Sequence, residues 1–148
     1  MKLQTGVASC GAAALANALA ALGFVLGEDA VAAAAGTDGD GTGIRGLKRA
    51  ARALGASVDV ISERDGVAAY YRLRGHLDAG EAAVLCFDAG KHWVTAVGLL
   101  GGLVLVVDPA MTVRDMLSPM GMEDLLAYWT SGDSRRPRYA LVLSEKED

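Results

Sequence analysis

Hydrophobic residues recur at helical spacing through the first third of the chain. Leu15 and Leu19 lie one helical turn apart in an alanine-rich run, which predicts a helix over residues 9–22. The same periodicity predicts a short helix over 28–35 and another over 44–54. The amino-terminal part of the chain is therefore expected to be helical.

From Ser57 onward the pattern changes to alternation and to short apolar runs, which are typical of strands. A short helix is expected over 122–129, whereas 66–79 fits either a helix or a loop, and a loop is expected after Pro109. Strands are predicted at 57–63, 82–87, 93–100, 103–107 and 139–143. Helices first and antiparallel strands later describe an α+β domain in which a helical lobe packs against a sheet.

Length and composition narrow the class of protein. A chain of 148 residues is expected to form one domain, residues 1–148, with a core of its own. Hydrophobic residues make up 52% of it and the mean hydropathy is +0.29, but alanine supplies much of that fraction and the longest apolar runs are shorter than a bilayer span. No signal peptide is evident, so a cytoplasmic protein without a membrane span is expected.

Charge and cysteine content exclude further classes of function. A net charge of −4, with no basic face, argues against a nucleic-acid partner. Two cysteines supply neither a disulfide framework nor a zinc ligand set. The glycine-rich segment 36–43 lacks the residues of a phosphate or calcium loop, so it is interpreted as a connector that borders a substrate groove. No cofactor and no metal are expected.

Cys10 is the first candidate for chemistry. It stands where an irregular segment becomes the first predicted helix, and there a thiol meets unpaired backbone N–H groups and the positive end of the helix dipole. Both favour the thiolate that a nucleophile requires. Gly11 leaves room for a substrate backbone to approach. Cys86 lies inside an apolar strand pattern and is expected to be a small buried hydrophobe.

A partner for Cys10 would be one of two histidines. His76 is expected to be a surface residue, whereas His92 immediately precedes a predicted strand. If 93–100 and 103–107 form a hairpin through their Gly-Gly link, the start of one strand lies beside the end of the other. His92 and Asp108 then emerge at the same edge, where the carboxylate would accept from His92 Nδ1–H. A packed histidine and a turn-forming Asp-Pro remain the alternatives.

Gln4 lies six residues before Cys10. A side-chain amide there could donate to an oxyanion together with the Cys10 backbone N–H. Gln4 is therefore a candidate for the oxyanion hole, although a glutamine near a terminus would mean nothing by itself.

These residues, taken together and in this order, resemble the double-glycine peptidase family. The likeness rests on Gln4, Ser9-Cys10-Gly11 with its following helix, His92-Trp93-Val94 and Asp108-Pro109, and it extends to a middle segment with Gly43, Leu47, Ala50, Ala51 and Gly55. Members of this family are papain-like cysteine proteases. They remove leader peptides from bacteriocins, usually as the amino-terminal domain of an ABC exporter.

The resemblance implies a fold and a set of roles. The fold would be papain-like, with a helical lobe led by the nucleophile helix and packed on an antiparallel sheet. Cys10 would be the nucleophile, His92 the general base and then acid, and Asp108 the orienting carboxylate. Gln4 would complete the oxyanion hole. The substrate would be a peptide or protein with small residues near the scissile bond, cleaved through a thioacyl-enzyme.

Two departures from the family pattern bear on the substrate. The family commonly has an acidic residue where this chain has Ser9, and no membrane span or Walker loop is present. The chain is therefore expected to be a stand-alone domain, with a separate transporter or pathway protein as a partner. An acyltransferase or peptide ligase with the same triad, and a non-catalytic peptide-binding module, are the alternative functions.

Overall fold

The computed structural model describes residues 10–24, 44–87, 92–108, 117–130 and 138–145, and its centre is a six-stranded sheet. The strand order is β1-β6-β2-β3-β4-β5, and every neighbouring pair is antiparallel. The strands span Ala56–Glu63 (β1), Ala82–Phe87 (β2), His92–Leu100 (β3), Leu103–Val107 (β4), Leu117–Met120 (β5) and Arg138–Glu145 (β6).

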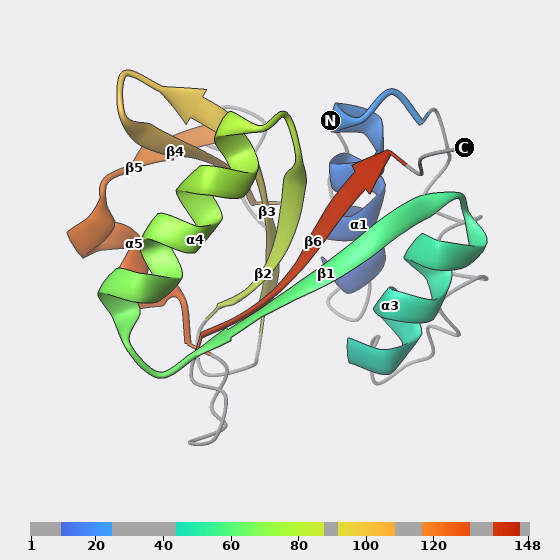
Figure 1. The fold of residues 1–148 in the computed structure, drawn as a ribbon, viewed down its shortest axis with the longest axis horizontal. Coiled ribbons are helices and arrows are strands. Elements are labelled where there is room, and N and C mark those ends of the chain that lie inside the picture. Colours follow the sequence, from blue (N-terminus) through green and yellow to red (C-terminus); the bar gives the residue numbers. More distant parts are fainter. Residues whose placement is uncertain (1–9, 25–43, 88–91, 109–116, 131–137, 146–148) are drawn as a thin grey trace.

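One face of the sheet is covered by two helices, α1 (Cys10–Ala21) and α3 (Ile44–Ala53) (Figure 1). The buried residues of α1 are mostly alanine, which allows its backbone to lie close to the strands. In α3, Leu47 and Ala51 face the core while the arginines are exposed, as an amphipathic helix requires.

The opposite face carries α4 (Gly66–Asp78) and α5 (Met122–Tyr128), on the other side of the sheet in Figure 1. Asp65 caps α4 by accepting from the backbone N–H of Val67 at 2.9 Å. The buried stripe of α4 is Ala69, Tyr70, Leu73 and Leu77, at helical spacing. Alternation along the strands supplies both cores: Val84 and Cys86 face α1, whereas Leu85 and Phe87 face α4 and α5.

Most of the predicted elements are present, with three differences. The ambiguous segment 66–79 is a helix, α4, because its apolar stripe and its cap agree. The loop expected after Pro109 was wrong in its later part, because β5 lies there. This strand is short, contains Pro119 and lies at the end of the order of described strands, beside β4; such an edge position is where proline is tolerated in a sheet. Helices cover both faces of the sheet rather than forming one lobe.

Some expectations fall on residues that the structure does not describe. The predicted helix 28–35 and the glycine-rich segment 36–43 lie outside the described residues, as does Gln4. Within the described part of the chain, no helix is both long enough and apolar enough to cross a membrane.

Candidate active site

The hairpin that should bring His92 and Asp108 together is present. Strands β3 and β4 pair antiparallel through Gly101 and Gly102, which have φ values of 56° and 85°. Two successive positive φ angles are what a tight two-residue hairpin turn demands, and glycine adopts them without strain. The start of β3 and the end of β4 therefore lie at one edge of the sheet.

A β-bulge decides which face of the sheet Asp108 shares. Near the turn, Gly98 pairs with Leu105, but beyond the irregularity Thr95 pairs with Val107. Continuing that register puts Asp108 opposite Val94, on the same face as His92 by alternation. Without the extra residue, Asp108 would lie opposite Thr95 and on the other face. The hairpin therefore joins the two candidates only because β3 carries one additional residue.

His92 and Asp108 are in direct contact. The distance from His92 Nε2 to Asp108 Oδ1 is 2.5 Å, and the two side chains are only 14% and 12% exposed. The expectation that Asp108 accepts from Nδ1 was wrong, because the structure uses Nε2. As diagonal neighbours the two side chains reach each other along the sheet edge, which brings the outer ring nitrogen to the carboxylate.

This contact determines which ring nitrogen of His92 is left to exchange a proton. A carboxylate on Nε2 holds that nitrogen as N–H, orients the ring and stabilises the imidazolium. The other nitrogen, Nδ1, is then the one that can take or give a proton. The described residues hold no group of three or more histidine, cysteine, aspartate or glutamate side chains suited to a metal ion.

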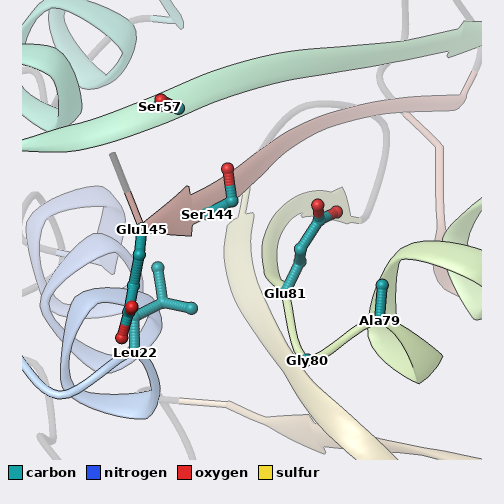
Figure 2. Close-up of a pocket in the computed structure, with 7 residues that line it drawn as sticks. All are labelled: Leu22, Ser57, Ala79, Gly80, Glu81, Ser144 and Glu145. Carbon is teal, nitrogen blue, oxygen red and sulfur yellow. The ribbon is translucent and has the colours of Figure 1, made fainter. Parts of the chain in front are cut away.

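The amino-terminal end of helix α1 points toward the sheet edge that carries His92 and Asp108. Leu22, directly after α1, lines a cavity of about 690 Å³ together with Glu81, Ser57 and the end of β6 (Figure 2). Glu81 precedes β2, and the start of β2 pairs with the later half of β3, because Ala83 lies opposite Ala96. The carboxyl-terminal end of α1 is therefore at the sheet edge remote from His92, and Cys10, the first residue of α1, begins at the other end.

The expectation for Cys86 is confirmed, whereas the expectation for His76 is not. Cys86 is 3% exposed and lies in the core against α1, which confirms its expected role as a small hydrophobe. His76, expected at the surface, is instead partly buried, with its Nδ1 at 2.5 Å from Glu81 Oε2. It lies on α4, near the edge remote from His92.

One aromatic contact beside His92 could not be predicted from the sequence. Phe87 is the cross-strand partner of His92, and its ring stacks on Tyr128 at a centroid distance of 6.0 Å. Phe87 is buried, whereas Tyr128 of α5 is half exposed. Residues 41 positions apart make this contact, so no local pattern could have predicted it.

Solved structures with this fold come from several bacterial peptidases. The peptidase domain of Streptococcus ComA, a bifunctional ABC transporter, matches with a TM-score of 0.71 at 18% identity, over 98% of this chain and 97% of that one. A double glycine motif protease from an AMS/PCAT transporter, in complex with its leader peptide, matches with a TM-score of 0.72 at 20% identity, over 97% and 89%. A C39-like peptidase from Bacillus anthracis matches with a TM-score of 0.70 at 14% identity, over 100% and 96%.

The fold class predicted from the sequence, α+β and papain-like, is thereby confirmed. A search of curated proteins finds no match. The model of the Peptidase C39 family matches residues 1–132, which include the helix that begins at Cys10 and the hairpin with His92 and Asp108. The chain belongs to the Peptidase C39 family and is a cysteine peptidase.

Proposed function

We propose that the protein cleaves a peptide or protein through a Cys10–His92–Asp108 triad. The observation that carries this proposal is the His92–Asp108 contact. It lies at the edge of the sheet toward which the amino-terminal end of α1 points. A thiol nucleophile needs a base whose ring a carboxylate orients, and a helix N-terminus favours its thiolate.

The reaction would proceed in two steps. The Cys10 thiolate attacks the scissile carbonyl, the C–N bond breaks, and His92 gives a proton to the leaving amine. Water then attacks the thioester, His92 takes up its proton, and the S–C bond breaks to release the new carboxyl terminus. The Cys10 backbone N–H, together with the Gln4 side chain, would bind the oxyanion of each tetrahedral intermediate.

For the substrate, we propose a peptide with small residues before the scissile bond, as in a double-glycine leader. Family membership supports this, and one structural relative was solved with its leader peptide bound. Gly11, directly after the nucleophile, has no side chain to oppose a substrate backbone. The precursor would be presented by, or passed to, a transporter or pathway protein in the cytoplasm.

Thiol reactivity tests the triad without a known substrate. Iodoacetamide alkylation is followed against pH and resolved by peptide mass for Cys10 and for Cys86, the internal control. We expect Cys10 to react as a thiolate below the reference pKa of about 8.5, and His92→Ala to slow it at neutral pH. Cys86 should stay unreactive until the protein is unfolded, because it is 3% exposed. A Cys10 that behaves identically in His92→Ala would refute the triad.

The reaction itself is tested with a synthetic peptide that carries a Gly-Gly junction, with a Val-Val junction as control. Cleavage after the second glycine, lost in Cys10→Ala, is the expected result. A product that carries an added amine instead of a free carboxyl would identify the acyltransferase alternative. Binding of the peptide with no turnover, despite a reactive Cys10, would identify the non-catalytic binding module.

A further inference from the structure

Thr95 makes a hydrogen bond that ties α1 to β3. Its hydroxyl donates to the backbone carbonyl of Ala14 at 2.5 Å, and the side chain is fully buried. The two residues are 81 positions apart in the chain. A threonine in the interior of a strand is ordinary, but the hydroxyl of Thr95 bonds to the backbone of a different element, α1.

The bond joins the helix that begins with Cys10 to the strand that begins with His92. Ala14 is four residues after Cys10, about 6 Å along a helix at 1.5 Å per residue. Thr95 is three residues after His92, about 10 Å along a strand at 3.3 Å per residue. Since α1 and β3 both begin at the same edge, a shift of the helix along the strand would change the position of Cys10 relative to His92.

Most of the other side chains that α1 buries are apolar. Most of the surface that α1 buries against the sheet is alanine and leucine, and apolar packing of this kind is not directional. A hydrogen bond of defined length and angle fixes the helix at one position along the strand.

We propose that Thr95 is a positioning residue of the peptidase, because it holds α1 at the height on β3 where Cys10 meets His92. This inference rests on the proposed function, in which those two residues react together. Thr95 would act through the position of α1 and not as a reacting group. A displacement of about 1 Å at a reacting atom can cost about a hundredfold in rate. Loss of a single interior hydrogen bond would therefore have a measurable effect if it let α1 shift by that distance.

Two variants separate the hydroxyl from the volume of the side chain. Thr95→Val keeps the shape and removes the donor, whereas Thr95→Ser keeps the donor. Val142→Ala, in the core on the opposite face, is the matched control for lost stability, because Val142 is 2% exposed and packs against α4 and α5. Thr95→Ala serves in place of Thr95→Val if the valine variant does not fold.

The measured quantities are the pH profile of Cys10 alkylation, kcat and KM on the cleaved peptide, and the melting temperature. We expect Thr95→Val to slow Cys10 alkylation at neutral pH by about fivefold or more and to lower kcat at least tenfold, with KM little changed. Thr95→Ser should stay within about twofold of wild type, which is rescue by the conservative variant. Val142→Ala should lower the melting temperature and leave the alkylation profile unchanged.

Two results would overturn the inference. One is a Thr95→Val enzyme with the wild-type alkylation profile and kcat; the other is a Val142→Ala enzyme that loses activity by the same factor as Thr95→Val. Failure of the proposed function is distinguishable, because His92→Ala would then leave Cys10 alkylation unchanged. If His92→Ala alters Cys10 but Thr95→Val does not, only the positioning role fails.

Discussion

Replacing Asp108 probes how much the carboxylate contributes to the site. The His92–Asp108 hydrogen bond is 2.5 Å long between side chains that are 14% and 12% exposed, so solvent screens it little. Asp108→Ala removes both the acceptor and the charge. Asp108→Asn removes the charge but keeps a carbonyl oxygen that can still accept from His92 Nε2–H.

The two variants have different expected magnitudes. A hydrogen bond with a charged partner contributes about 1.5–3 kcal/mol, and a neutral one about 0.5–1.5 kcal/mol. At about 1.36 kcal/mol per tenfold in rate, Asp108→Ala should lower kcat/KM by about 10- to 150-fold. Asp108→Asn should lose only the difference, about 1–1.5 kcal/mol, which is about 5- to 13-fold.

The assay is kcat/KM on the cleaved peptide, with Cys10 alkylation at neutral pH as a readout that needs no substrate. Both rates should follow the order wild type, Asp108→Asn, Asp108→Ala, because a less stable imidazolium leaves less Cys10 as thiolate. The melting temperature of each variant excludes a loss of folded protein as the cause. An Asp108→Ala enzyme within about threefold of wild type would refute the orienting role.

Two further predictions concern stability. Gly55 has a φ of +104°, so Gly55→Ala should destabilise the fold by about 1–2 kcal/mol, whereas Gly75→Ala, inside α4 with open space at its Cβ, should stabilise it by about 0.5–1 kcal/mol. Urea midpoints that shift in the same direction for both would contradict the backbone argument. Trp129 is fully buried and donates from Nε1 to the Tyr139 carbonyl at 2.9 Å. Trp129→Phe should therefore cost about 2 kcal/mol and lower the melting temperature by about 4–8 °C in a scanning calorimeter; a shift under about 1 °C would show that this contact contributes nothing.

Local patterns located nearly all of the described elements. The helix that begins at Cys10 follows from apolar spacing, and the β3–β4 hairpin follows from two apolar runs joined by Gly101-Gly102. These signals are readable because helical and strand periodicities arise within a few neighbouring residues. The edge strand β5 was missed, because four residues with an internal proline carry too little of such a pattern.

Locating the candidate site required both the sequence pattern and the tertiary structure. That His92 and Asp108 share one sheet edge was predictable, because antiparallel pairing alone brings the start of one strand to the end of the next. That they share one face was not, because side chains alternate every residue and a single bulged residue moves Asp108 to the face of His92. The contact through Nε2 and the Thr95 bond to Ala14 likewise depend on distances between segments remote in the chain, and those distances exist only once the sheet and α1 have packed.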